Sequence, residues 1–409
     1  MADMTVDIVV VGAGVVGAAA ALGLADAGFQ VAVIERAAPS RLSGALGFDP
    51  RTIALSPASR TLLEASGGWP DAGVCAYQRM TVWDAEGVGE LSFAAAELEP
   101  AEPALGYILE LSSLTSGLWR ALNAHPRLRV FAPANVVRLG FAPRGVGLTD
   151  GTYITAPIVI GADGANSQLR SLAGGAVRAQ ATGQVAVAAV VRHERPHAHT
   201  AWQRFLPTGP LAFLPLHDLK ADSEVQRCSA VIWSCTQARA EELRALDDAQ
   251  FAAALRVAFE SRLGAIRAVD TRMYVPLVQQ QAQRYQPRPG VVLIGDAAHV
   301  VHPLAGQGMN LGLRDVRVLT EVLSRAVEVP AVLSEATLLA GLLDRYETRA
   351  RTVNALAIAF MGGVQGVFGE DGLLARGARN EGLRLVARLP ALKAQVAREA
   401  MGRGLLFAP

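Results

Sequence analysis

Three glycines near the amino terminus have the types and spacing of a dinucleotide-binding turn. Gly12, Gly14 and Gly17 follow the β-branched run Asp7–Val11 and precede an alanine-rich helix, Ala18–Ala27. In such a turn the first glycine permits a tight bend, the second lets a pyrophosphate approach the backbone, and the third lets the helix pack on the strand. Strand, turn and helix in this order are far more specific than the glycines alone.

An acidic residue ends the next predicted strand, Gln30–Ile34. Glu35 can accept hydrogen bonds from the hydroxyls of a ribose, as the acid at this position does in dinucleotide-binding folds. The neighbouring Arg36 would instead suit a 2′-phosphate. The acid favours the adenosine ribose of FAD or NAD.

A second stretch with chemical potential runs over residues 291–316, VVLIGDAAHVVHPLAGQGMNLGLRDV. It predicts a buried strand, a turn at Gly295 and Asp296, a loop rich in proline and glycine, and then a helix. Asp296 ends the strand, where open α/β sheets place ligand contacts. The start of the helix favours negative charge because free backbone N–H groups gather there, at Gly306, Gln307 and Gly308.

Two further polar positions are compatible with both structural and binding roles. Asp163 follows the strand Ile158–Ile160 in a DGxxSxxR pattern, whose Ser167 and Arg170 fall on one face of the next helix. We expect these side chains to hold the turn in any case, and the open question is whether they also meet phosphates. Arg51 lies where the chain should pass back across the nucleotide, and it is either a surface residue or a neighbour of the diphosphate or flavin.

The rest of the chain predicts a second structural unit. With 409 residues, of which 51% are hydrophobic and 18% charged, the chain is long enough for two domains or for one domain with a large insertion. Met80–Phe93 predicts a hairpin and Asp247–Arg262 a helix. Further strand-like segments predict one antiparallel sheet with helical cover that would carry the substrate: Val185–Val191, Gln203–Leu206, Leu211–Leu214 and Ser229–Ser234.

Composition excludes several classes of function. The net charge of +1 gives no indication of nucleic-acid binding. Three cysteines without metal-ligand spacing suggest buried thiols in a reducing compartment. Ile8–Ala25 carries no charge, but no basic segment precedes it, so we expect neither a signal peptide nor a membrane span. The cytoplasm is the default location.

The carboxyl-terminal region predicts helices. Leu339–Phe368 is the first, and Asn380–Gly402 mixes leucines with arginines and a lysine. A basic amphipathic segment of this kind either docks on its own domain or lies on an anionic membrane surface.

The three turns, in this order and at wide separations, resemble the class A flavoprotein monooxygenases of the p-hydroxybenzoate hydroxylase type. Within that class, residues 302–316, with FDPRTIALS at 48–56, LGYILE at 105–110 and WQRFLPTGPLAFLPL at 202–216, resemble the FAD-dependent hydroxylases of ubiquinone biosynthesis. Pro50 departs from the family, which usually has glycine there, and this leaves the path of the loop around Arg51 in doubt.

The resemblance implies an α/β fold: a Rossmann-like FAD-binding domain with an inserted antiparallel β-sheet substrate domain and carboxyl-terminal helices. The predicted FAD-binding domain is discontinuous and comprises residues 1–75, 105–180 and 270–370. The substrate domain would comprise 76–104 and 181–269, and residues 371–409 would form a helical segment with a possible membrane-surface contact.

The resemblance also implies the chemistry. NAD(P)H would reduce FAD, O2 would add at flavin C4a, and the hydroperoxide would hydroxylate a polyprenylated phenol or quinol. Carried over by position, Gly12, Gly14, Gly17 and Glu35 would hold the ADP half, with Asp163 near the pyrophosphate and Asp296 on the ribitol. The isoalloxazine ring would be bordered by Pro303, Gly306, Gln307, Gly308, Met309 and Asn310.

No conventional catalytic group is assigned, because the cofactor carries out the difficult step. His299 and His302 are three residues apart, but no third ligand follows, so we expect no metal. Other ubiquinone-biosynthesis enzymes and a second copy of the chain remain open as partners. The alternatives are an FAD hydroxylase of a small soluble phenol and a flavin-bearing scaffold subunit of a quinone-making complex.

Overall fold

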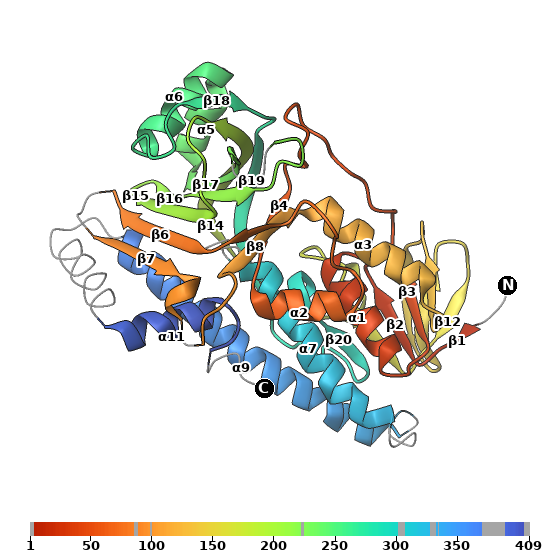
Figure 1. Cartoon of the computed structure of the whole chain (residues 1–409). Coiled ribbons are helices and arrows are strands. Elements are labelled where there is room, and N and C mark those ends of the chain that lie inside the picture. Colours follow the sequence, from red (N-terminus) through yellow and green to blue (C-terminus); the bar gives the residue numbers. More distant parts are fainter. Residues whose placement is uncertain are drawn as a thin grey trace.

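The computed structural model describes residues 4–85, 89–98, 100–221, 225–301, 307–327, 333, 335–369 and 389–404. The described residues form four β-sheets, of which the two largest have five and nine strands. The five-stranded sheet lies among helices α1, α3 and α7, and the nine-stranded sheet lies beside α5 and α6 (Figure 1). The fold is therefore of the α/β class, as the sequence predicts.

The five-stranded sheet is parallel throughout and has the order β20-β13-β2-β3-β9. Its strands are β2 (Ile8–Val11), β3 (Val31–Ile34), β9 (Leu128–Phe131), β13 (Ile158–Gly161) and β20 (Val291–Leu293). Every residue of β2, β3, β13 and β20 is buried, as expected when both faces of a parallel sheet are covered. The strand order reverses between β2 and β13, and ligands bind outside the carboxyl ends of strands at such a point.

Helices cover one face of the parallel sheet and a small sheet covers the other. Val10 of β2 packs into the core beneath the helices, whereas Val9 and Val11 pack against the small sheet. The helices are α1 (Val15–Asp26), α2 (Pro57–Ala65), α3 (Leu111–Ala124), α7 (Gln307–Val327) and α9 (Ala336–Gly369). The small sheet comprises β1 (Met4–Thr5), β10 (Val136–Phe141), β11 (Arg144–Leu148) and β12 (Tyr153–Thr155).

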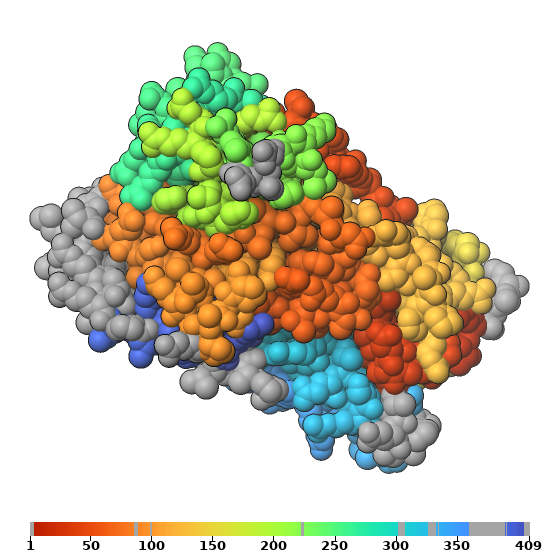
Figure 2. All heavy atoms as spheres, viewed as in Figure 1, coloured from red at the N-terminus to blue at the C-terminus, as the bar shows by residue number. Residues whose placement is uncertain are grey.

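The nine-stranded sheet carries the second core. Its path is β21-β19-β14-β17-β16-β15-β6-β7, with β18 paired to β14. Its strands are β6 (Arg79–Asp84), β7 (Glu90–Ala94), β14 (Val177–His193), β15 (Thr200–Leu206), β16 (Gly209–Leu216), β17 (Cys228–Thr236), β18 (Ile266–Val269), β19 (Met273–Ala282) and β21 (His299–Val300). Helices α5 (Gln237–Ala245) and α6 (Asp248–Ala258) cover one face, and residues of this region, green in Figure 2, project from the rest of the molecule.

Two features of this sheet differ from the sequence prediction. The sheet is not purely antiparallel, because β15 pairs in parallel with β6. A parallel pair needs a crossover connection rather than a hairpin. Here the chain between β6 and β15 contributes strands to the other sheets before it returns to this one. In addition, β19 and the beginning of β14 join this sheet, although both fall inside segments predicted for the FAD-binding domain.

The sequence does not predict a strand at the beginning of β14, and the reason is physical. From residue 177 to 184 its side chains are exposed or half-buried, whereas every residue of Val185–Val191 is buried. A bulge between Ala181 and Val185 separates these two parts. The first part therefore lacks the alternating apolar pattern that identifies a half-buried strand.

A three-stranded sheet and a terminal helix complete the described structure. The sheet has the order β4-β8-β5, with β4 (Thr52–Leu55), β5 (Cys75–Tyr77) and β8 (Gly106–Glu110). Helix α11 (Pro390–Ala400) packs its Ala397 against Leu91 and Phe93 of β7, and Lys393 forms an ion pair with Glu97 (2.7 Å). No helix in the described ranges is long and apolar enough to cross a membrane.

Candidate active site

The turn between β2 and α1 has two glycines that allow no side chain and one that faces open space. A Cβ atom at Gly12, where φ is +100°, would lie 2.4 Å from the carbonyl oxygen of Ala162. A Cβ atom at Gly17 would lie 2.0 Å from the carbonyl oxygen of Gly12. At Gly14, which is exposed, a Cβ atom would meet nothing within 4 Å. The first and third glycines therefore serve backbone packing, and the second leaves room for a bound group.

Glu35 lies against this glycine turn. Its Oε2 accepts a hydrogen bond from the backbone N–H of Ala13 (2.6 Å), and its Oε1 accepts one from Ala37 (3.3 Å). The structure thus brings the acid at the end of β3 next to the turn at the end of β2, as their positions in the sequence predict. Arg36 is exposed.

The turn after β13 is held by its own polar side chains. Asp163 accepts hydrogen bonds from the hydroxyl of Ser167 (2.5 Å) and from the backbone N–H of Leu169 (3.0 Å). Arg170 is 7% exposed and donates to the carbonyl oxygens of Ala165 and Ala297, each at 2.8 Å. These hydrogen bonds hold the turn, and Arg170 also ties it to the turn after β20. A contact of Asp163 with a pyrophosphate stays a prediction.

The turn after β20 meets the other two. Gly295 has a φ of +56°, and a Cβ atom there would lie 3.1 Å from Val16 at the start of α1. The backbone N–H of Ile294 donates to Gly161 at the end of β13 (3.0 Å), and that of Ala162 donates to Val11 at the end of β2 (2.8 Å). The three turns therefore gather at the carboxyl edge of the parallel sheet.

Asp296, in the 3₁₀ turn Gly295–Ala297, is the charged residue that this edge presents to a cavity. Its side chain is accessible from the cavity, but protein surrounds it on most sides. This burial raises the pKa of Asp296 above its usual value, and the nearby His299 partly offsets the effect. A ligand with hydroxyl groups would supply hydrogen bonds that favour the carboxylate.

A buried histidine–aspartate pair supports this turn. His299 Nε2 lies 2.6 Å from Oδ2 of Asp315 on α7, and both side chains are 1% exposed. The same oxygen accepts a hydrogen bond from the backbone N–H of Gly295 (3.0 Å). The other carboxylate oxygen of Asp315, Oδ1, accepts one from Nδ2 of Asn354 (3.0 Å). Burial lowers the pKa of His299, but the attraction and hydrogen bond of Asp315 outweigh it and leave the pKa raised.

Sequence reasoning missed Asp315 and Asn354. The available signal was a charged residue in an otherwise apolar helical stripe, because Leu311, Leu319 and Leu323 of α7 are fully buried. The described residues contain no group of three or more side chains suited to hold a metal, and His302 lies outside them.

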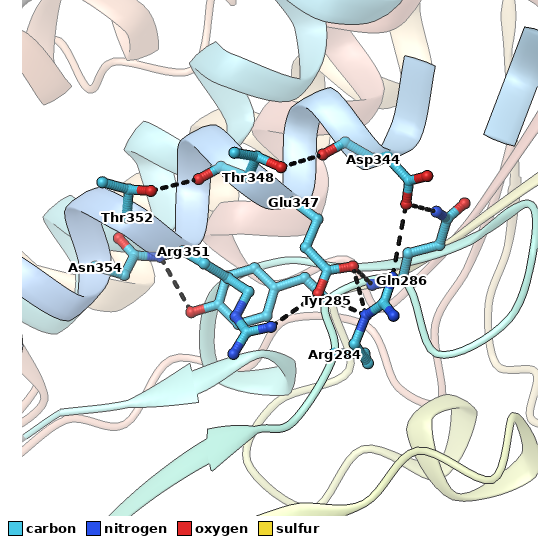
Figure 3. A network of polar contacts seen from close by, with 9 residues as sticks. All are labelled: Arg284, Tyr285, Gln286, Asp344, Glu347, Thr348, Arg351, Thr352 and Asn354. Atoms are coloured by element: carbon cyan, nitrogen blue, oxygen red, sulfur yellow. Dashed lines mark hydrogen bonds and ion pairs between the residues drawn. The ribbon is translucent and has the colours of Figure 1, made fainter. Parts of the chain in front are cut away.

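Helix α9 holds the segment that leads into β20 (Figure 3). Arg284 donates to both carboxylate oxygens of Glu347 (2.9 and 3.1 Å), and the backbone N–H of Gln286 donates to the same group (3.2 Å). Asn354 also reaches the hydroxyl of Tyr285 (3.4 Å). This network continues through Asn354 to Asp315, so it connects α9 with the turn that carries Asp296.

At the start of α7, three of the predicted flavin-site residues line the cavity, and the side chain of a fourth points away from it. Gln307, Gly308 and Met309 line the cavity. The side chain of Asn310 instead binds the segment between β4 and α2, where its Oδ1 accepts the N–H of Ser56 (2.8 Å). Pro303 and Gly306 lie outside the described residues.

Arg51 is committed to a buried acid. Its guanidinium makes two hydrogen bonds with Asp49 (3.0 and 2.7 Å) and one with the carbonyl oxygen of Ser40 (2.9 Å). The Arg51 side chain is one-third exposed, whereas Asp49 is fully buried. The pair holds the loop before β4. A position of Arg51 near a diphosphate or flavin stays a prediction.

The cavity has a volume of about 360 Å³ and lies between the carboxyl edge of the parallel sheet and one face of the nine-stranded sheet. Of the described residues that line it, Asp296 alone carries a charge, and most are apolar. The lining residues are Thr52, Ile53, Ala54, Tyr77, Met80, Ile108, Ala201, Trp202, Gln203, Pro210, Ala212, Leu214, Ile232, Ser234, Asp296, Val300, Val301, Gln307, Gly308, Met309 and Ala400. Such a surface suits a neutral, largely apolar ring.

Comparisons with known proteins decide which family this frame belongs to. A family model described as "FAD binding domain" matches residues 96–361, and one described as "FAD dependent oxidoreductase" matches residues 7–55. The chain is 37% identical to 3-demethoxyubiquinol 3-hydroxylase of Escherichia coli, over 98% of this chain and 100% of that protein. The chain belongs to the FAD-dependent monooxygenases of ubiquinone biosynthesis.

Other similarities agree with this family. Ubiquinone hydroxylase UbiL of Rhodospirillum rubrum is 35% identical over 98% of this chain and 90% of its own length. The crystal structure of p-nitrophenol 4-monooxygenase PnpA from Pseudomonas putida shares the fold, with a TM-score of 0.73 at 21% identity and with 98% and 99% of the two chains covered. The protein is thus an oxidoreductase that uses FAD as its cofactor, and the resemblance seen in the sequence is confirmed.

Proposed function

We propose that this FAD monooxygenase hydroxylates the ring of a polyprenylated quinol, with NAD(P)H and O2 as co-substrates. The observation that carries the proposal is the position of the cavity. It joins the edge where the three turns meet to an apolar sheet face, and the described lining offers no cation for a carboxylate-bearing ring. A neutral ring with a long apolar substituent fits this lining better than a small anionic phenol does.

The residues present fit the ADP half of FAD. The open space at Gly14, at the amino terminus of α1, would accept the pyrophosphate, where the helix dipole and free N–H groups favour negative charge. Glu35 lies beside that turn and would accept hydrogen bonds from the adenosine ribose. Asp163 and Arg170 would act indirectly, because their hydrogen bonds shape the neighbouring turn.

The residues also fit the flavin half. Asp296 would accept hydrogen bonds from the ribitol, and these bonds would compensate for the burial of its carboxylate. Gln307 and Gly308, at the start of α7, would lie against the isoalloxazine, where the helix terminus favours negative charge on the reduced ring. When bound, FAD supplies the electron transfer and oxygen activation, and the chain orients the ring and keeps water from it.

The location of the protein in the cell is a further part of the proposal. A polyprenylated substrate resides in a membrane, and Leu389 and Leu392 at the start of α11 are 45% and 40% exposed. We propose that these leucines make a peripheral contact with the membrane surface. Co-sedimentation with anionic vesicles tests this, and a Leu389→Ser, Leu392→Ser variant that sediments as the wild type does would overturn it.

The function is tested with the purified full-length protein, a short-chain prenylated quinol, NADH or NADPH, and ¹⁸O2. We expect one ¹⁸O atom in the product ring, and mass spectrometry of the product gives the position hydroxylated. Incorporation only into a small soluble phenol would favour the first alternative function. Restoration of quinone synthesis in a deletion strain by the Gly14→Val variant, shown to lack FAD, would favour the scaffold.

A further inference from the structure

One amide stands on the cavity face of the nine-stranded sheet. Ala201, Trp202 and Gln203 of β15 all line the cavity. The ring of Trp202 lies 6.3 Å from that of Phe259, between ring centroids, and packs in the core covered by α5 and α6, so the alternation of a strand places the side chains of Ala201 and Gln203 on the opposite face. The residues paired with Gln203 on the adjacent strands, Val82 and Ala212, are apolar. Gln203 is therefore a polar group in an apolar part of the wall.

The Gln203 side chain lacks a protein partner in the described ranges of the chain. The residue is only 7% exposed, and no hydrogen bond of its side-chain amide occurs there. A buried polar group left unpaired costs about 1–3 kcal/mol, so such groups almost always have a partner. An amide that opens into a cavity leaves its donor and acceptor available to whatever the cavity binds.

We propose that Gln203 recognises two neighbouring oxygen substituents on the substrate ring. Its C=O would accept a hydrogen bond from a ring hydroxyl, and its N–H would donate to the adjacent alkoxy oxygen. This inference rests on the proposed function and adds a specificity-determining residue to it. The amide is neutral, as is the surrounding wall, so it discriminates by the presence of the second oxygen and not by charge.

The test compares two short-chain prenylated quinols that differ at one position, where one has a methoxy group next to the ring hydroxyl and the other has an ethyl group of similar size. We expect the wild-type kcat/KM to favour the methoxy quinol by about tenfold, the value of one hydrogen bond. The Gln203→Leu variant should favour neither. The residues paired with position 203 are apolar, so a leucine should be tolerated there. The ratio of the two kcat/KM values, measured on one enzyme preparation, does not depend on the fraction of the enzyme that is folded.

A matched control makes the same change outside the cavity. Gln180 lies on β14 of the same sheet and is exposed, so Gln180→Leu should keep the wild-type ratio. FAD content should equal that of the wild type in both variants. A wild type without the methoxy preference, or a Gln203→Leu variant that retains it, would overturn the role of Gln203 alone. If the wild type hydroxylates neither quinol, the proposed function fails and this inference fails with it.

Discussion

The two sides of the cavity are specified in different ways. On the carboxyl edge of the parallel sheet, backbone atoms touch each other, and a side chain at Gly12 or Gly17 would collide with a carbonyl oxygen. On the face of the nine-stranded sheet, the wall consists of small and apolar side chains with one amide, Gln203. Changes on the first side should weaken or abolish cofactor binding, whereas changes on the second should alter which ring is accepted.

The largest effects should come from the glycine turn, and two variants separate folding from binding there. Gly12→Val would place a branched side chain at a φ of +100° and against the carbonyl oxygen of Ala162, so we expect a loss of stability of about 4 kcal/mol or more. Gly14→Val meets open space, so the FAD-free protein should remain as stable as the wild type.

Flavin absorbance and urea unfolding of the FAD-free proteins measure the two outcomes. Gly14→Val should lose FAD almost completely, because the side chain occupies the space proposed for the pyrophosphate. Full FAD content in Gly14→Val would contradict that placement. Equal instability of both variants would mean that the two glycines do not differ in the way the structure indicates.

The next effect concerns the buried pair behind the Asp296 turn. Asp315→Ala would leave His299 and the backbone N–H of Gly295 without their acceptor, and removal of one partner of a buried pair costs about 3–5 kcal/mol. The control Asp26→Ala removes an exposed aspartate that faces His125 and should cost about 1 kcal/mol or less. Denaturant unfolding measures both, and similar values for the two variants would contradict the supporting role of Asp315.

A smaller effect is expected from the cavity-facing acid itself. Asp296→Asn keeps the shape of the side chain and removes its charge, so FAD affinity should fall by about tenfold. The FAD-free protein should not be destabilised, because burial already disfavours the charge of Asp296. Titration of the FAD-free protein with FAD measures the affinity. Unchanged affinity would remove Asp296 from the ribitol site.

The smallest effect is a difference in pH response between the two regions. His193, in the nine-stranded sheet, is 1% exposed, and burial lowers its pKa to about 4. Its neutral ring therefore stabilises the fold above the unfolded pKa of about 6.5, and this contribution is lost as the pH falls through 4. His299 has a raised pKa, so its contribution is complete below about 6.5 and is lost as the pH rises through its folded value.

Hydrogen exchange of peptides from β14 and α7 can follow the two regions separately. Relative to the wild type at each pH, His193→Gln should reduce the acid sensitivity of β14, and His299→Gln should reduce the alkaline sensitivity of α7. The same direction of change in both peptides would show that the two histidines do not act locally.

The parts of the site that could be predicted from the sequence are those set by local chain geometry. Gly12, Gly14, Glu35 and Asp296 fall at strand ends, and the order of strands in an α/β sheet brings those ends together. Asp315 could not be placed in the same way. Its partner His299 lies on a different element, and only tertiary packing decides that a buried carboxylate meets the N–H of Gly295.

The same distinction applies to the nine-stranded sheet. Its buried strands are runs of mainly apolar residues that the sequence predicts. The parallel pairing of β15 with β6 could not be predicted, because elements of other sheets lie between the two strands in the sequence. Gln203 carries no local signal at all, since an amide in a strand is ordinarily a solvent-facing residue.

Helix α11 contributes Ala400 to the cavity, although it lies at the far end of the described chain. The ribosome therefore synthesises the glycine turns, the nine-stranded sheet, β20 and α7 before it adds this residue. The last part of the cavity lining is therefore synthesised only after both the cofactor-binding edge and the nine-stranded wall.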